Sequence, residues 1–183
     1  MYIGAIYAEQ EKFNEAAEHF TKLTKSQKGK EKEFLYYYYI GRVRVEQGEE
    51  FYPQAELAFS KSIVLKPKFE STTIALSKLY LIQKKDKKAI QLLQSYQERF
   101  VPKRNIASML ADLHIENDNF KLAYEQLEIL DGFDSQNMNL KLRMALILIK
   151  LKKNAEAIDQ LKNILRIQPD SDKVRFYLGS VYE

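Results

Sequence analysis

The feature that most constrains this chain is an internal repeat of 34 residues. Four alanines follow one another at that interval, and a large apolar residue stands four positions after each of them. The alanines are Ala55, Ala89, Ala123 and Ala157. A second series with the same spacing consists of Ala111, Ala145 and Gly179. A fixed period of this length indicates a solenoid, in which each short unit buries its apolar face against its neighbours.

The composition favours helices for these units. Among 183 residues there are only 4 prolines and 6 glycines, so the strongest helix breakers are scarce. There is no cysteine, which excludes disulfides, thiolate metal sites and a cysteine nucleophile. We expect an all-helical chain with short connections, and neither a cofactor nor a metal ion.

The pattern resembles that of the tetratricopeptide repeat family over nearly the whole chain. In that family the first helix has Leu-Gly-x2-Tyr, the second has Ala-x3-Phe, and proline follows. The first unit here reads Ile3-Gly4-x2-Tyr7 and then Ala16-x3-Phe20. The family's tryptophan is absent. Its place is taken by Tyr37 or by smaller residues, and His114 and Leu148 stand where the fourth and fifth units would have tyrosine.

This resemblance implies an all-α fold. The expected architecture is an α-solenoid of about five helix-turn-helix units plus a terminal helix, wound into a right-handed superhelix. We predict a single array over residues 1–183, with units at about 1–30, 31–67, 68–103, 104–136 and 137–170 and a half-unit at 171–183. Small residues at the helix contacts (Gly41, Ser77, Ala111 and Ala145) should let the paired helices approach closely. Both ends look unfinished, so we expect a fragment of a longer protein that self-associates through exposed terminal helices.

Catalysis is not expected. Only His19 and His114 could act as acid–base groups near neutral pH, and they belong to different units. We predict a packed or edge position for His114 and an exposed one for His19. The sequence has no paired histidines, no glycine-rich phosphate loop and no serine nucleophile elbow.

Nucleic acid and membrane are also not predicted as partners. The basic run Lys84 to Lys88 is followed one unit later by the turn Glu116 to Asn119, so the positive charge does not form a continuous stripe. The apolar stretch Ala145 to Ile149 is far shorter than the ~20 residues of a membrane helix. No signal peptide is recognisable, and both the cytoplasm and the periplasm remain open.

The four consecutive tyrosines from Tyr36 to Tyr39 are the most unusual local feature. Four successive residues point to all sides of a helix, so some must be buried and others exposed. The repeat register gives Tyr37 the packed position, and the resemblance implies that Tyr38 faces the concave groove of the solenoid. A packing role alone would explain the four tyrosines as well as a binding role would.

The resemblance places the functional site in that groove, along the first helix of each pair. Carried over from the family, the groove residues are Leu35, Tyr38, Arg42, Ser71, Ile74, Lys78, Asn105, Ser108, Asp112, Leu142, Leu146 and Ile149, with Val45, Leu81, Ile115 and Asn139 beside them. The lining would be basic and aromatic at one end, polar in the middle and apolar towards the C-terminus. It suits a segment with acidic and aliphatic parts. The paired Lys and Asn of the carboxylate-clamp subfamily are not reproduced.

Two functions therefore remain. The first is a scaffold or adaptor that binds a peptide or a partner helix in the groove, in a style similar to bacterial assembly and envelope scaffolds. The second is a regulatory module that senses a peptide and controls a fused or partner domain. In both cases the partner is a protein or peptide.

Overall fold

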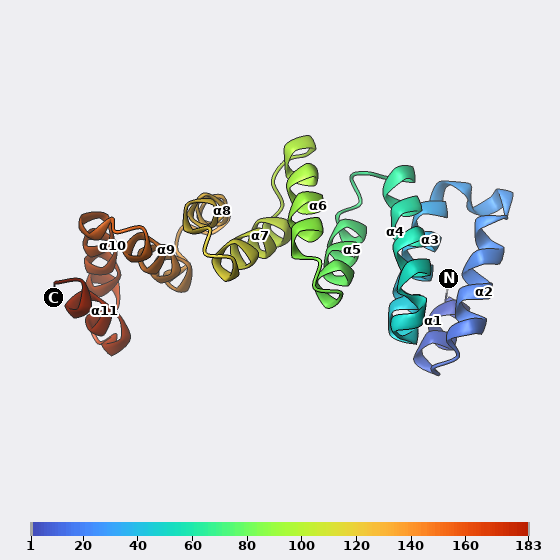
Figure 1. Cartoon of the computed structure of the whole chain (residues 1–183), viewed down its shortest axis with the longest axis horizontal. Helices are drawn as coiled ribbons and strands as arrows, with labels where there is room; N and C mark the ends of the chain where they lie inside the picture. Colours follow the sequence, from blue (N-terminus) through green and yellow to red (C-terminus); the bar gives the residue numbers. More distant parts are fainter. Residues whose placement is uncertain (1, 183) are drawn as a thin grey trace. The chain divides into compact units, whose positions relative to one another are not determined.

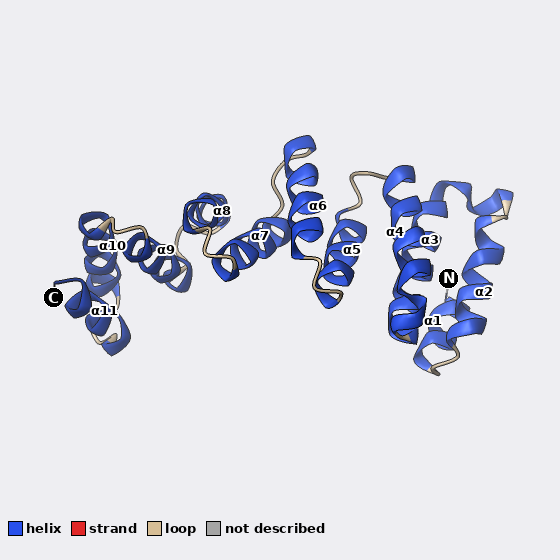
Figure 2. Ribbon diagram, viewed as in Figure 1, coloured by secondary structure: helices blue, strands red, loops and turns tan. Residues whose placement is uncertain are grey.

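The computed structural model describes residues 2–182, and the regular elements in that range are all helical (Figures 1 and 2). The α-helices there are α1 (Tyr2–Glu9), α2 (Phe13–Thr24), α3 (Glu33–Gln47), α4 (Tyr52–Leu65), α5 (Glu70–Ile82), α6 (Asp86–Arg99), α7 (Arg104–Glu116), α8 (Phe120–Phe133), α9 (Met138–Lys150), α10 (Asn154–Ile167) and α11 (Asp172–Tyr182). Two 3-10 segments, Gln27–Lys32 and Glu49–Phe51, precede α3 and α4. The predicted all-α fold of helical pairs is confirmed.

The chain divides into two compact halves, residues 1–100 and 101–183. In the N-terminal half each of the helices α1 to α6 packs on the next one in sequence, and the same holds for α7 to α11 in the C-terminal half. α11 also contacts α9. Each half is therefore a stack of helices held together by contacts between close neighbours in the sequence, as the repeat predicts.

The repeated alanines lie fully buried between helices. Ala55, Ala89, Ala123 and Ala157 have no exposed surface, and the large residues four positions later are at most 1% exposed. Those large residues are Phe59, Leu93, Leu127 and Leu161. A methyl side chain lets a neighbouring helix approach, and the large residue one turn later fills the adjacent space. This is why the 34-residue period is visible in the sequence.

The turn within most helical pairs is built without glycine. Glu11, Lys84, Asp118 and Lys152 have positive φ angles between 55° and 59°. In each turn the next residue donates its N–H to the carbonyl five positions earlier, as from Lys153 to Leu148 at 2.9 Å. This hydrogen bond is that of the Schellman motif, which ends a helix tightly. In the second unit Gly48, with φ of 116°, takes the turn, and the extra residues there form the 3-10 segment before α4.

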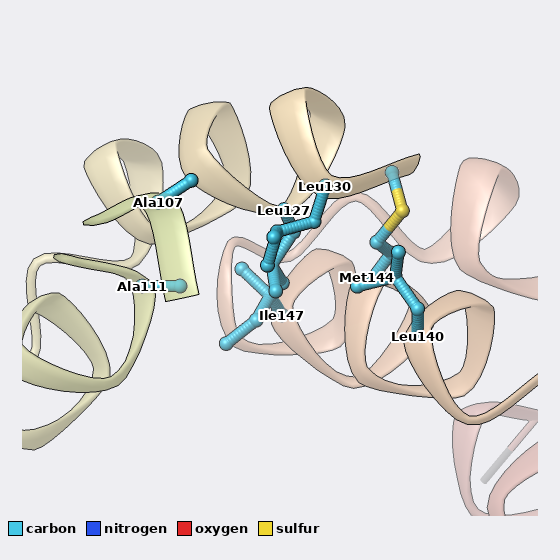
Figure 3. Packing of buried hydrophobic residues seen from close by; sticks show 7 residues of the cluster. All are labelled: Ala107, Ala111, Leu127, Leu130, Leu140, Met144 and Ile147. Atoms are coloured by element: carbon cyan, nitrogen blue, oxygen red, sulfur yellow. The ribbon is translucent and has the colours of Figure 1, made fainter. Parts of the chain in front are cut away.

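In the C-terminal half one of the hydrophobic cores lies between α7, α8 and α9 (Figure 3). Its buried members are Ala107, Ala111, Leu127, Leu130, Leu140, Met144 and Ile147. Alanines from α7 face leucines from α8, and larger side chains from α9 complete the layer. This core positions α7 and α9, the two helices that bound the second cavity described below.

Candidate functional site

A cavity of about 470 Å³ lies between α3 and α5, the first helices of two consecutive pairs in the N-terminal half. Its lining residues are Tyr38, Arg42, Val45, Glu46, Phe59, Ser71, Ile74, Ala75, Lys78, Leu79 and Ile82. On each helix they follow one another at intervals of one, three or four residues, which keeps them on one face. We call this cavity the α3–α5 groove.

Five of the six groove residues predicted in this half line the α3–α5 groove. They are Tyr38, Arg42, Ser71, Ile74 and Lys78. The sixth, Leu35, lies one turn before Tyr38 on α3, is half-buried and does not line the cavity.

The floor of the groove is apolar and aromatic. The ring of Tyr38 lies 6.2 Å from that of Phe59 and makes an edge contact with Phe69 at 5.4 Å between centroids. Leu79 and Phe59 are each 1% exposed, so the floor belongs to the core. Such a surface can bury an apolar side chain of a ligand without rearrangement.

The rim of the groove has two cations and one carboxylate. Arg42 and Lys78 are exposed, on α3 and α5 respectively, and Glu46 lies one turn after Arg42. Neither cation forms an ion pair within the described part of the chain. Both can therefore pair with carboxylates of a ligand that lies on the apolar floor.

A second cavity, of about 320 Å³, lies between α7 and α9 in the C-terminal half. It is lined by Arg104, Asn105, Ser108, Leu130, Asn137, Asn139, Leu140 and Arg143. Two of the predicted residues, Asn105 and Ser108, are among them, as is Asn139. The predicted Asp112 lies outside this lining and forms an ion pair with Arg143 at 2.5 Å. Three asparagines and one serine line this cavity beside two arginines and two leucines, so it can take up polar groups such as peptide backbone.

The three apolar residues predicted for the C-terminal end of the groove are placed differently. Leu142 is only 8% exposed and packs in the core formed by α9, α10 and α11. Leu146 and Ile149 are half-buried against the same core. α11 packs on both α9 and α10, and this leaves little of the surface of Leu142 for a ligand.

The tyrosine run is oriented one residue away from the prediction. Tyr36 is the buried tyrosine, at 7% exposed, so the packed position predicted for Tyr37 was wrong. Tyr37 is half-buried, and Nζ of Lys61 lies 5.3 Å from its ring centroid. Tyr36 packs in a core with Ala17 and Phe20 of α2. The register within a single unit does not take this contact with the preceding unit into account.

The two histidines are both packed rather than free. His114 is 2% exposed, which confirms the packed position. His19 is half-buried and makes edge contacts with the rings of Tyr7 and Phe20, so its predicted exposure was wrong. Nδ1 of His114 has no hydrogen-bond partner among residues 2–182. Burial lowers the pKa of this imidazole, with a smaller opposing effect of Glu125. Among the described residues no three His, Asp or Glu side chains are grouped to hold a metal ion.

We expect the free energy of unfolding to decrease as the pH falls below about 6.5, in part because of His114. The folded state holds this side chain neutral because its pKa is lowered, whereas the unfolded state takes up a proton. The His114→Tyr variant should lose less stability than the parent chain between about pH 7.5 and pH 5. Urea denaturation at several pH values measures this. An identical pH dependence in both proteins would contradict it. Burial also lowers the pKa of His19, so part of the pH dependence should remain.

Within residues 2–182, none of the helices combines the length and the apolar character needed to cross a bilayer.

Comparison with known proteins identifies the repeats. Residues 140–171 match the family model of the tetratricopeptide repeat. Solved structures of tetratricopeptide repeat proteins superpose on most of the chain. The chain has the fold of tetratricopeptide repeat proteins. The matched residues fall mainly on α9 and α10, where Ala145 and Ala157 mark the register.

Three structures illustrate this tetratricopeptide-repeat fold. YrrB, described as a TPR protein with an unusual peptide-binding site, is 16% identical over 91% of this chain and 83% of its own, with a TM-score of 0.67. A tetratricopeptide repeat protein from Parabacteroides merdae is 11% identical over 99% of this chain and 70% of its own, with a TM-score of 0.69. MamA is 16% identical over 94% and 92%, with a TM-score of 0.66. At these identities the likeness concerns the fold alone. No curated protein sequence matches the chain.

Proposed function

We propose that this tetratricopeptide-repeat chain is a protein-binding scaffold that holds an extended peptide or a partner helix in the α3–α5 groove. The observation that supports this most is the combination of an apolar floor with two cations that have no carboxylate partner in the described residues. Arg42 and Lys78 rise from different helices on the two sides of that floor. A ligand with aliphatic or aromatic side chains and flanking carboxylates satisfies both features.

Two further observations agree with a peptide ligand. The lining of the α7–α9 cavity includes Ser108 and Asn139, whose hydroxyl and amide can bond to peptide N–H and C=O groups. YrrB, which shares the fold, is described as having a peptide-binding site. The scaffold function thus depends on binding rather than on any catalytic group.

The test is capture of partners with a charge-reversed groove. The chain and its Arg42→Glu/Lys78→Glu variant are immobilised and exposed to nuclease-treated lysate of the source organism, and bound proteins are identified by mass spectrometry. A control bait with Lys87→Glu and Lys121→Glu has the same net charge as the groove variant. Both control lysines are exposed and lie outside the two cavities.

We expect a discrete protein to bind the parent chain and the control bait but not the groove variant. With the purified partner, the groove variant should bind at least about tenfold more weakly. A tenfold change in Kd corresponds to about 1.4 kcal/mol, and the variant reverses two groove charges that would pair with carboxylates of the ligand. Equal capture by all three baits would show that the α3–α5 groove is not the binding site. Retention seen only in a parallel lysate that has not been treated with nuclease would refute the scaffold function.

A further inference from the structure

The outer face of α4 is apolar at two positions where the following units have polar residues or glycine. Leu57 and Val64 are 59% and 79% exposed. In the repeat register the next three units have Gln91, Glu125 and Asp159 at the first of these positions and Glu98, Gly132 and Arg166 at the second. The repeat itself therefore does not require apolar residues here, and their exposure in the second unit needs another reason.

A second departure from the repeat lies next to this face. Arg44 of α3 occupies the register position that Tyr7 and Tyr80 occupy in the first and third units. Its guanidinium donates hydrogen bonds to Oδ1 of Asn14 and Oε1 of Gln47, which orient it. Where a tyrosine ring would fill space between helices, the second unit instead presents an oriented cation.

Two cavities open around Tyr37 beside these residues. One, of about 450 Å³, is bounded by α2, α3 and α4, and Lys25, Arg44 and Leu57 are among its lining residues. The other, of about 310 Å³, is lined on its α4 side by Lys61 and Val64. Tyr37 and Lys61 line both cavities, and the ammonium of Lys61 lies over the tyrosine ring. We call the surface formed by Lys25, Tyr37, Arg44, Leu57, Lys61 and Val64 the α4 surface.

The charge of the α4 surface is predominantly positive. Lys25, Arg44 and Lys61 line its cavities, whereas Glu33 is the only carboxylate lining either of them. None of the three cations takes part in an ion pair among the described residues. No residue is shared with the α3–α5 groove, because α4 presents Phe59 to that groove and Leu57 and Lys61 to the other side.

We propose that the α4 surface is a second docking site, which binds an acidic amphipathic segment of another protein. Apolar side chains of that segment occupy the cavities at Tyr37, next to Leu57 and Val64. Its carboxylates pair with Lys25, Arg44 and Lys61, so that charge sets the orientation and the association rate. Because this site and the α3–α5 groove have no residue in common, the chain can bind two partners at once.

The experiment uses a phage-displayed library of random short peptides, selected on the whole 183-residue chain. Selected peptides are synthesised, and their affinities are measured by fluorescence anisotropy for the parent chain and for Leu57→Ser, Lys61→Glu and Lys78→Glu variants. All three positions are exposed, so the variants should keep the helical content of the parent by circular dichroism. We expect a class of peptides with acidic and apolar residues. Both Leu57→Ser and Lys61→Glu should weaken their binding at least about tenfold, and Lys78→Glu should leave it unchanged.

Three outcomes would overturn the proposal. The selection could give no acidic peptide that depends on Lys61. The peptides could depend on Lys78 alone, which would assign them to the α3–α5 groove and leave only the groove function standing. Light scattering could instead reveal a dimer that Leu57→Ser dissociates, and the occupant of the α4 surface would then be a second copy of this chain.

Discussion

The Leu127→Ala variant is expected to lose about 2–5 kcal/mol of its free energy of unfolding. Leu127 has no exposed surface and lies among side chains from α7, α8 and α9 in the core of the C-terminal half (Figure 3). Its neighbours Ala107 and Ala111 are too small to fill the space that its removal would leave. The loss therefore includes a cavity contribution as well as the transfer free energy of the missing atoms.

Leu122→Ala is the matched control, since Leu122 is on the same helix and is 39% exposed. We expect it to change the free energy of unfolding by less than about 1 kcal/mol. Urea denaturation followed by far-UV circular dichroism measures both variants. Repeat arrays need not unfold in one step, so amide hydrogen exchange in α7 to α9 should be recorded as well. Equal losses in the two variants would disprove the role assigned to Leu127.

The fold could be predicted from the sequence because its buried small and large residues recur with a fixed period. At Ala55 and its equivalents only a small side chain fits, because these positions are fully buried. One turn later Phe59 or a leucine fills the adjoining space. The same register brought five groove residues of the N-terminal half together, since it assigns each of them to one face of a first helix.

Contacts between neighbouring units could not be predicted in the same way. Tyr36 rather than Tyr37 is buried because α2 supplies Ala17 and Phe20 as its packing partners. Leu142 is covered because Val174 of α11 packs into the same core. In both cases a helix of another unit covers one side of the helix that carries the residue. The register within one unit does not include that covering helix, so it cannot predict which side is buried.

The α4 surface shows a signal that the sequence did contain. Arg44 at a tyrosine position and Leu57 at a position that is polar in the following units are both visible once the units are aligned on their alanines. Their exposure and the cavities at Tyr37 follow only from the structure. Aligning the units thus marks the proposed docking surface as a departure from the repeat.

The Gly41→Ala variant is expected to lose about 1–3 kcal/mol of its free energy of unfolding. A Cβ at Gly41 would lie 2.5 Å from ring carbons of Phe59, which is closer than carbon atoms can approach. Phe59 is 1% exposed, so its ring cannot move aside without displacing its neighbours. Alanine alone would favour the helix by up to about 1 kcal/mol over glycine, and the steric cost outweighs this gain.

Gly179→Ala in α11 provides the control with the opposite sign. Outside its chain neighbours and the backbone of its own helix, no atom of the described residues lies within 4 Å of a Cβ built at this glycine. Helix propensity is therefore the change that counts, and a gain of about 0.5–1 kcal/mol is expected. Urea denaturation of both variants measures the pair, and a gain in both would refute the close contact at Gly41. Since Phe59 also lines the α3–α5 groove, Gly41→Ala should weaken ligand binding there. In the Gly41→Ala background, Phe59→Leu should recover part of the lost free energy of unfolding, because it removes the ring that the new methyl group contacts.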